Sequence, residues 1–460
     1  MKNFDNVSNL KTQIRFVNHA SVLIGSENKT ILCDPWYEQS AFNKGWNLLF
    51  ENSNKEILDI ISQTKFIWIS HEHPDHFSVN FFEKFRDYLI KYKIIILFQK
   101  TLDNKVINFL KKYGFNVLEL KFNKWISLTK GLDVFCIKDR RYDSALLIKI
   151  NGEKLLNLND CIVNKLKRAK EIFGETGKVD ILLTQFSYAA WKGGKQNIKW
   201  REKAAIEKLE AIKLQLNIFQ PRYLVPFASF IYFSNVENFY LNDSRNSIKK
   251  VYQYLSKSFN NCIIMKPGDV LGGPLQDINT NRAIDFWNDL DDSISEKELN
   301  YFEKVDYITL KKLFLNFNRR INEKNNMFLI KIIRKISPIK FFNPVRIYLT
   351  DLDLVIEFDY INTYIKNTNK TSHISMHSES LAFIFKNSYG FQTLTINACF
   401  EETCRNGLEV VTRTLAIDAF NNSGIYFSLK TLLNLKLIFS SLFYLNNIKK
   451  HLIYNQQSSD

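Results

Sequence analysis

The stretch Ser70-His71-Glu72-His73-Pro74-Asp75-His76 follows the apolar run Phe66–Ile69, and it decides how this sequence is interpreted. Three of the chain's seven histidines lie in it, interleaved with an aspartate. Neutral imidazole and carboxylate are the usual protein ligands of zinc and iron. The apolar run predicts a buried strand, and a loop at its carboxyl end lets these side chains converge on one ion. The H-x-H-x-D-H spacing therefore predicts a metal site and not a solvated polar turn.

Seven further segments, spread over roughly the first 275 residues, carry a resemblance to a known family. They are Asn18–Ile24, Asp34–Trp36, Ala41–Trp46, Asp143–Ile148, Leu156–Cys161, Gln220–Phe230 and Lys266–Gly268. With the histidine loop, they resemble the metallo-β-lactamase superfamily, and within it the β-lactamase-like part of the CMP-N-acetylneuraminate hydroxylase family. The resemblance implies an α/β fold, a four-layer αββα sandwich with the metal site at one edge.

Length and patterning predict two domains, because 460 residues exceed what one hydrophobic core usually holds. Residues 1–275 alternate between extended and helical patterns, which fits sheets with helices outside, and we assign them to a metal-binding catalytic domain. The polar residues 276–300 are expected to form a linker or a surface helix. Strands are expected at Ile14–Val17, Thr30–Cys33, Phe66–Ile69, Ile94–Phe98, Val134–Ile137, Ala145–Ile150, Lys154–Leu158, Ile181–Thr184 and Tyr223–Val225, and helices at Val79–Tyr92, Lys105–Tyr113 and Glu202–Leu216.

Residues 301–460 are expected to form a smaller C-terminal α+β domain that supplies no metal ligand. Its pattern resembles the sterol-carrier-like domains attached to some β-lactamase-fold hydrolases. His373 and His377 fall in this strand-rich region and are interpreted as surface residues. Extended segments are expected at Phe341–Phe358, Ser380–Phe385 and Gln392–Phe400, and helices at Val410–Ala419 and Ser428–Ser441.

The superfamily resemblance implies a site for two metal ions. One ion would be held by His71, His73 and a later histidine. The other would be held by Asp75, His76 and a last histidine, with Asp160 bridging both ions. No histidine lies between His76 and His373, so both later histidines are missing. Asp143 stands where the first is expected, and the segment Leu224–Phe230, where the last is expected, contains no imidazole.

Asp143 shifts the expected metal toward iron. Two histidines and one carboxylate form the facial ligand set of oxygen-activating non-haem iron enzymes, although zinc also accepts such sets. We expect one or two metal ions, iron or zinc, with the second site the weaker. Asp75 and Asp160 are the candidate catalytic residues, and Asp160 would orient a metal-bound hydroxide.

Five more residues are candidates for orienting the ligands or for binding substrate. Asp34 is expected to orient the histidine loop through hydrogen bonds. His19 is assigned to the surroundings of the ligands or to the substrate pocket. Trp191 and Lys192 follow the strand Ile181–Thr184, on the side where substrate loops usually emerge. Lys192 and Arg222 could bind an anionic phosphate or carboxylate.

Two enzymatic functions fit the sequence. The ligand set and the resemblance favour a non-haem iron oxygenase that hydroxylates a nucleotide-activated or otherwise anionic sugar. The hydroxylase family also carries a Rieske iron–sulfur domain, which needs two cysteines and two histidines. None of the six cysteines here stands in C-x-H or C-x-x-H, so electrons are expected from a separate protein. The alternative is a metal-dependent hydrolase of an ester, amide or phosphodiester bond, which needs no redox partner. A scaffold with a residual site is disfavoured by the complete histidine loop.

The net charge of +16 is concentrated in one region. Between Lys311 and Arg346 there are ten basic residues and one acidic residue, Glu323. Phe328, Ile332, Ile333 and Ile336 recur at helical spacing beside these charges. The pattern fits a helix docked on the core with a solvated basic face, or a basic amphipathic helix on an anionic membrane surface. No nucleic-acid reader motif accompanies the charge, so no specific nucleic-acid binding is expected.

The sequence predicts a cytoplasmic protein or, as the alternative, a protein attached peripherally to a membrane. The first residues lack the apolar core of a signal peptide, and no long uncharged apolar run follows. The six scattered cysteines show no regular spacing, which predicts buried reduced thiols and not a disulfide framework.

Overall fold

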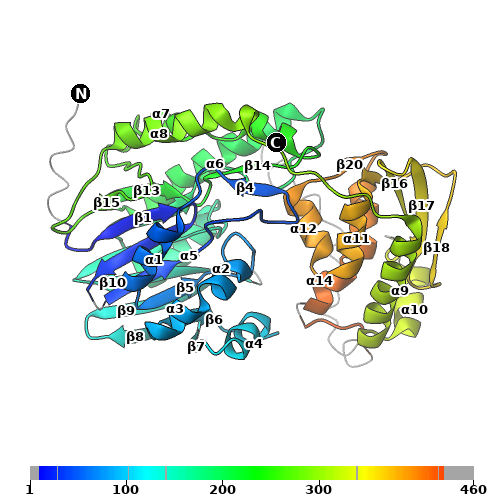
Figure 1. Cartoon of the computed structure of the whole chain (residues 1–460), viewed down its shortest axis with the longest axis horizontal. Helices are drawn as coiled ribbons and strands as arrows, with labels where there is room; N and C mark the ends of the chain where they lie inside the picture. The colour runs from blue at the N-terminus through cyan, green and yellow to red at the C-terminus, as the bar shows by residue number, and fades with distance from the viewer. Residues whose placement is uncertain are drawn as a thin grey trace.

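The computed structural model describes residues 10–27, 29–101, 103–139, 142–337, 340–422 and 424–428. In this part of the chain two large sheets pack face to face, and helices cover their outer faces (Figure 1). The first sheet has the strand order β15-β1-β2-β3-β5-β6-β7 and the second the order β13-β12-β11-β10-β9-β8. The first sheet consists of β1 (Ile14–Asn18), β2 (Ser21–Ser26), β3 (Lys29–Cys33), β5 (Phe66–Ile69), β6 (Ile95–Gln99), β7 (Asn116–Leu120) and β15 (Val270–Leu271). The second consists of β8 (Trp125–Thr129), β9 (Leu132–Asp139), β10 (Asp143–Ile150), β11 (Glu153–Asn157), β12 (Ile181–Gln185) and β13 (Tyr223–Phe227).

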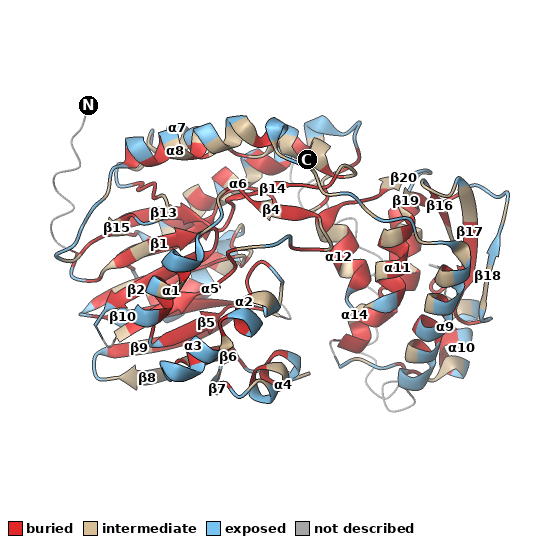
Figure 2. Cartoon of the chain, in the orientation of Figure 1, coloured by how far each residue is buried: buried red, intermediate tan, exposed pale blue. Residues whose placement is uncertain are grey.

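The layering follows from strands that are buried on both faces. In β5, Phe66 and Trp68 pack into the core between the sheets, whereas Ile67 and Ile69 pack against the outer helices. Figure 2 shows these central strands as buried and the outward faces of the covering helices as exposed. The four-layer αββα sandwich expected from the sequence is therefore confirmed. The first sheet is covered by α1 (Asn54–Gln63), α2 (Val79–Lys84), α3 (Arg86–Lys91) and α4 (Lys105–Lys112), and the second by α5 (Leu166–Thr176), α6 (Ile198–Phe219) and α7 (Ile248–Leu255).

The strand directions bring several loops to one edge of the sandwich. Strands β3, β5 and β6 are mutually parallel, and β1 shares their direction because it is antiparallel to β2, which is antiparallel to β3. Strands β11, β12 and β13 are also parallel to one another. Strand β10 is antiparallel to β11, so the amino end of β10 lies beside the carboxyl end of β11. Residues that follow β1, β3, β5 and β11, and the residue that begins β10, therefore meet at this edge.

Two predictions about the first 300 residues need refinement. The predicted helix Val79–Tyr92 is broken at Phe85 into α2 and α3. The segment 276–300 contains α8 (Thr280–Asp292), followed by η2 (Ser293–Glu296), so the surface-helix alternative describes it. Helix α8 is attached to the sandwich by Trp287, which is fully buried and stacks on Phe230 with ring centroids 3.9 Å apart. Short strands β4 (Trp46–Leu48) and β14 (Ile231–Phe233) pair with each other, and η1 (Phe239–Ser244) follows them.

The C-terminal region forms a second group of elements beside the sandwich, at the right of Figure 1. Its sheet has the order β18-β17-β16-β19-β20, and a hydrophobic core distinct from the one between the two large sheets lies between this sheet and its helices. The strands are β16 (Val345–Leu349), β17 (Leu354–Asp359), β18 (Tyr364–Asn367), β19 (Ile374–Met376) and β20 (Glu401–Glu402). The helices are α9 (Tyr307–Lys324), α10 (Met327–Ile336), α11 (Ser378–Lys386), α12 (Gly390–Asn397), α13 (Gly407–Leu415) and α14 (Ile417–Asn422).

Two strand predictions in this region are wrong. Ser380–Phe385 lies in α11, and most of Gln392–Phe400 lies in α12. A short apolar run does not distinguish a buried helix from a strand by its period, so tertiary packing decided. The start of α11 is capped by His377, whose side chain accepts a hydrogen bond from the backbone N–H of Glu379. The extended Phe341–Phe358 and the helical Val410–Ala419 are confirmed, the latter as α13 and α14. Residues 429–441 of the predicted helix Ser428–Ser441 lie outside the described residues.

His373 is also not the surface residue that the sequence suggested. It is 7% exposed and lies against Arg346, whose backbone N–H donates to its Nδ1 at 3.1 Å. His377 lies 3.7 Å from Asp351. Both histidines thus have structural partners within the C-terminal region.

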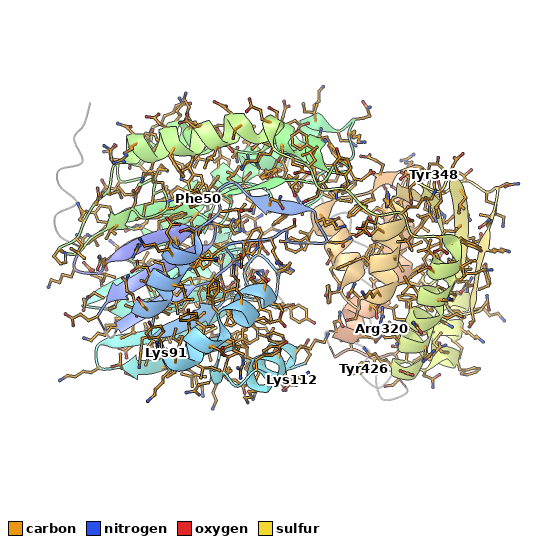
Figure 3. All side chains as sticks on the ribbon, in the orientation of Figure 1. Phe50, Lys91, Lys112, Arg320, Tyr348 and Tyr426 are labelled. Atoms are coloured by element: carbon orange, nitrogen blue, oxygen red, sulfur yellow. The ribbon has the colours of Figure 1, made fainter. Side chains whose placement is uncertain are left out.

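The C-terminal core continues into the sandwich. It includes Trp36, Phe42, Trp46 and Trp191 together with the C-terminal helices. The side-chain amide of Asn397 donates to the carbonyl of Phe42 at 3.0 Å. Within the C-terminal group, Arg320 of α9, labelled in Figure 3, pairs with Asp418 of α14 at 2.7 Å. In the described part of the chain, no helix has the length and apolar character needed to cross a membrane.

Candidate metal centre

The histidine loop is held in place by hydrogen bonds to Ser70, the residue that follows β5. The side-chain amide of Gln99, at the end of β6, donates to the carbonyl of Ser70 at 2.8 Å. The hydroxyl of Ser144, at the start of β10, donates to the same carbonyl at 2.7 Å. Both sheets therefore fix the backbone from which the loop side chains project.

Asp34, at the end of β3, accepts hydrogen bonds from several residues of the site. Its carboxylate accepts from the N–H and hydroxyl of Ser70, both at 2.8 Å, and from Nδ1 of His76 at 3.1 Å. The side-chain amide of Asn159 also donates to it. Asp34 is 1% exposed, so its charge lies inside the protein and is balanced by these donors. This is the orienting position that the sequence predicted for Asp34, with Nε2 of His76 left facing the other ligands.

Ser70 also fixes the protonation of His71. The hydroxyl hydrogen of Ser70 is donated to Asp34, so its oxygen accepts from Nδ1 of His71, which lies 2.9 Å away. The free electron pair of His71 is then on Nε2, the atom that faces His73 and Asp143. Nε2 of His71 lies 2.8 Å from Nδ1 of His73 and 4.0 Å from Oδ1 of Asp143. Burial, together with a neighbouring histidine, lowers the pKa of His71 and of His73 to about 4. Both rings are therefore neutral at pH 7, which is the form that binds metal.

A second cluster lies directly beside the first. Nε2 of His76 is 3.2 Å from Oδ2 of Asp75 and 3.5 Å from Oδ2 of Asp160, and Nε2 of His19 is 3.6 Å from the same Asp75 oxygen. Burial alone would lower the pKa of His76, but Asp75, Asp160 and Asp34 raise it well above its ordinary value. Burial alone would raise the pKa of Asp75 and of Asp160, but His76 lowers both. His76 and the two carboxylates thus favour each other's charged forms.

The donor atoms of these clusters fit a bound metal ion. Within the described residues, Oδ1 of Asp75, Nε2 of His76 and both ring nitrogens of His19 are buried without a hydrogen-bond partner. Buried polar groups are rarely left in this state, because each costs about 1–3 kcal/mol. Two groups have ligand atoms within 4.8 Å of one another, namely His19, Asp75 and His76, and His71, His76 and Asp160. Imidazole and carboxylate in these combinations are ligands for iron and zinc.

The two clusters open into one large cavity of about 850 Å³. His73, Asp75, Asp143 and Asp160 lie at one end of its lining. Four basic side chains, Lys165, Arg168, Lys192 and Lys208, line it as well, together with Glu207. The C-terminal region also contributes to the wall, with Gln392, Ile396, Ala416, Ala419 and Phe420.

The structure brings together most of the residues singled out in the sequence, but not all. His71, His73, Asp75, His76, Asp143, Asp160, His19 and Asp34 gather at one edge, and Lys192 lines the cavity. Trp191 is buried instead, with its ring stacked on Phe400 at 5.2 Å. Arg222 lies at the start of β13, at the opposite end of the sheet from the metal cluster, near Asp180 and Glu153. The expectation that Arg222 meets substrate is therefore not supported by its position.

Sequence reasoning did not single out Asn159 or the basic residues Lys165, Arg168 and Lys208. Asn159 falls inside the segment Leu156–Cys161, so its place beside the predicted Asp160 was a usable signal. Nothing in the sequence distinguished these basic residues from the other lysines and arginines, of which the chain has 63 in all. Only the fold places these particular ones at the cavity.

Comparison with known proteins identifies the domain that carries this site. A family model described as a β-lactamase superfamily domain matches residues 13–200. The cytidine monophosphate-N-acetylneuraminic acid hydroxylase of Danio rerio is 25% identical over 278 residues, which cover 56% of this chain and 45% of the relative. The hydroxylase of the same name from Mus musculus is 26% identical over 297 residues, covering 60% and 49%. The chain thus spans about half the length of the curated relatives it matches.

Two solved structures illustrate the range of structural neighbours. CmlA, a diiron β-hydroxylase from Streptomyces venezuelae, is 14% identical, with coverage of 57% of this chain and 54% of CmlA and a TM-score of 0.41. Human tRNase Z, short form, is 12% identical, with coverage of 57% and 100% and a TM-score of 0.35. The match of residues 13–200 to the β-lactamase superfamily domain agrees with the sandwich topology and with the position of the histidine loop.

Proposed function

We propose that the chain is a metal-dependent enzyme that hydroxylates a nucleotide-activated or otherwise anionic sugar. The observation that carries the proposal is the placement of two histidine–carboxylate clusters at the end of a single cavity with basic lining residues. His71, His73 and Asp143 would hold one ion, and Asp75, His76 and Asp160 the other. The first set has two imidazoles and one carboxylate, the set typical of oxygen-activating non-haem iron.

The cavity supports an anionic substrate of moderate size. Its volume of about 850 Å³ lies in the usual range for small-molecule sites. Lys165, Arg168, Lys192 and Lys208 come from loops and helices of the second sheet, so they surround the approach to the carboxylate-rich cluster. Basic side chains of this kind attract and orient phosphate and carboxylate groups. The substrate's anionic groups would be held there, with its reacting carbon directed toward His73 and Asp143.

Iron, when bound, would supply the activation of dioxygen. Hydroxylation places one oxygen atom of O₂ into a C–H bond and reduces the other to water, which takes two electrons and two protons. The six cysteines form no disulfide, and although Cys161 lines the cavity beside Asp160, none of the six stands in the C-x-H or C-x-x-H spacing of a Rieske cluster. We therefore assign the electron supply to a separate protein. The aromatic side chains of Phe42, Trp46 and Tyr188 line the cavity and would exclude water from the reacting carbon.

The sequence relatives support hydroxylation as the type of reaction. They are named hydroxylases of a sugar nucleotide, and they match 56% and 60% of this chain. Because the match spans about half of their length, the substrate is assigned here by class only.

The test is reconstitution under controlled redox conditions. Protein purified anaerobically is analysed for iron and zinc, loaded with Fe(II), and incubated with O₂, a reducing system and a panel of nucleotide sugars that includes CMP-linked sialic acid. We expect a product heavier by one oxygen atom, which depends on reductant and disappears in His73→Ala. Asp133→Ala, a β9 variant outside the clusters, should retain activity. Absence of product across the panel, with the iron bound, would overturn the proposal.

A metal-dependent hydrolase is the second candidate, and the position of Asp160 favours it. One oxygen of Asp160 lies within 4.8 Å of ligand nitrogens of both His71 and His76. A carboxylate that reaches both clusters can orient a metal-activated water between them. This function predicts that zinc-loaded protein cleaves ester, amide or phosphodiester substrates without O₂ or reductant. An oxygen-dependent reaction in the same assay excludes it.

A further inference from the structure

We propose that His19 is a ligand of the metal ion held by Asp75 and His76. The inference rests on the metal-dependent function proposed above, but it concerns a residue outside the histidine loop. His19 follows β1 and lies at the turn into β2, more than fifty residues before the loop. It would complete a cluster that otherwise has the three side chains of Asp75, His76 and Asp160.

The side chain of His19 points at the other ligands. Its Nε2 lies 3.6 Å from Oδ2 of Asp75, and Nε2 of His76 lies 3.2 Å from that same oxygen. The ligand atoms of all three residues are within 4.8 Å of one another. The ring is 2% exposed, and the edge of Trp36 packs against it with ring centroids 5.5 Å apart. His19 is therefore directed into the cluster and shielded from water.

The imidazole of His19 makes no hydrogen bond that would explain it as a structural histidine within the described residues. Neither ring nitrogen has a hydrogen-bond partner within the described residues. A structural histidine normally satisfies its N–H and its acceptor nitrogen, because a buried unsatisfied polar atom costs about 1–3 kcal/mol. A bound ion would use one nitrogen directly and would draw Asp75 and His76 into the same coordination sphere.

The backbone at His19 is held in an unusual conformation. Its φ angle is +33°, in a region that residues other than glycine rarely adopt. The Asn18 side chain accepts from the N–H of His19 at 2.9 Å, and the N–H of Ala228 donates to the His19 carbonyl at 2.8 Å. These two hydrogen bonds hold a turn of rare backbone conformation at the residue whose imidazole faces Asp75, and such conformations cluster at functional sites. The segment Leu224–Phe230, which has no imidazole of its own, lies directly against His19 through this contact.

The test measures metal binding and not activity. His19→Asn removes the imidazole but keeps a residue that tolerates positive φ, so the turn is retained. Titration with Zn(II) or Co(II) should show two ions for the wild type. His19→Asn should lose the second ion or bind it more weakly, by at least the roughly 10–100-fold that supporting residues cost, and should retain the first. His73→Ala should lose the first ion and retain the second. Trp36→Phe, which changes the packing on His19 and removes the Trp36 Nε1 donor to the carbonyls of Glu38 and Gln39, should retain both ions.

The absorption spectrum of bound Co(II) distinguishes a metal ligand from a residue that only packs beside one. Loss of a ligand changes the spectrum, whereas loss of packing does not. If His19→Asn binds both ions with unchanged affinity and an unchanged cobalt spectrum, the inference is wrong while the proposed function stands. Wild-type protein that binds no ion would instead refute the proposed function itself. A His19→Gln variant, compared by near-ultraviolet circular dichroism, replaces His19→Asn should the latter fail to fold.

A separate observation concerns the outer face of α10, and we infer that it binds an anionic lipid membrane. Leu329, Ile330 and Ile333 anchor the helix to the C-terminal core. Phe328 and Ile336, each 72% exposed, and Ile332, 38% exposed, form an apolar line on its outer face. The helix docks on the core, as one of the two sequence alternatives expected, and it still presents an apolar face to the outside.

The charges beside this apolar face indicate an anionic membrane as its binding partner. Lys331 and Lys335 are exposed beside the apolar line, and α10 contains no acidic residue. Arg334 is directed inward, where it pairs with Asp359 at 2.7 Å. The helix thus combines bulky apolar side chains with lysines that can reach lipid phosphates, as interfacial amphipathic helices do.

Vesicle flotation tests this inference. Wild-type protein should float with vesicles containing phosphatidylserine and not with phosphatidylcholine alone, and high salt should weaken binding because the screening length falls to about 3 Å at 1 M. The double variant Phe328→Glu/Ile336→Glu should stay with the unbound protein. Leu275→Glu changes an equally exposed apolar residue in the first 300 residues and should float like wild type. Negligible wild-type flotation in every condition, or normal flotation of the double variant, would overturn the inference.

Discussion

Replacing Asp34 by asparagine should weaken the metal centre although Asp34 is not one of the proposed metal ligands. Its carboxylate accepts hydrogen bonds from Ser70, His76 and Asn159, all of which act as donors. Asparagine has nearly the same shape, but its amide offers one acceptor oxygen and one donor nitrogen. At least one buried donor would then face another donor, and His76 would lose the acceptor that keeps its Nε2 directed at Asp75.

The size of the effect can be worked out from these contacts. One or two buried donors left without an acceptor cost about 1–3 kcal/mol each, so Asp34→Asn should destabilise the metal-free protein by about 1–6 kcal/mol. Misorientation of His76 should lower metal affinity by roughly 10–100-fold. The matched control is Asp59→Asn. Asp59 also forms a close pair, 2.8 Å from Arg15, but its side chain is 51% exposed, so its loss should cost about 0–1 kcal/mol and leave metal affinity unchanged.

Two measurements check this reasoning. Urea unfolding of the chelator-treated proteins gives the difference in stability, and competition with a chromogenic chelator gives the metal affinity. Asp34→Asn should differ from wild type in both, and Asp59→Asn in neither. If the two variants behave alike, Asp34 does not hold the site together in the way described.

Three more predictions follow from the site. Asp143→Ala should lower metal occupancy about as much as His73→Ala, measured by elemental analysis, while Asp133→Ala should not. Asp133 is preferred as the control over Asp139, which lies nearer to Asp143 in the sequence, because the Asp139 carboxylate accepts a hydrogen bond from the N–H of Ile162 and pairs with Arg168. The metal-free protein should lose stability as the pH falls from 6.5 to 4, because the lowered pKa of His71 and His73 lets the unfolded chain bind more protons there, worth about 3 kcal/mol per histidine. The raised pKa of His76 adds stability that is complete below pH 6.5 and is lost as the pH rises above it, so His76 does not contribute to the slope between pH 6.5 and 4. A slope in urea unfolding that His73→Gln leaves unchanged would contradict the assignment. Ala419→Trp should fill part of the cavity and raise KM at least tenfold with metal content unchanged, and an unaltered KM would show that α14 does not border the substrate.

The sequence by itself determined the sandwich domain and the core of the candidate metal site. The reason is that these features are local. The H-x-H-x-D-H loop places its ligands within a few residues of one another, and the apolar strands end directly before the loop and before Asp160. Buried strands such as Phe66–Ile69 have a strong pattern, because their two faces enter two different cores. Asp143 was found through a resemblance to a motif, and antiparallel pairing of β10 with β11 accounts for its position.

The tertiary structure decided the features that depend on distant segments. His19 reaches Asp75 because β1 and β5 run in the same direction in one sheet, a relation that no spacing in the sequence reveals. The basic lining of the cavity was selected from many similar side chains by the placement of α5 and α6. The segments of α11 and α12 became helices because their short apolar runs fit either structure until they packed beside the sandwich, where Asn397 meets Phe42. Local patterns thus determined which residues can bind a metal, and strand pairing and packing determined which of them meet.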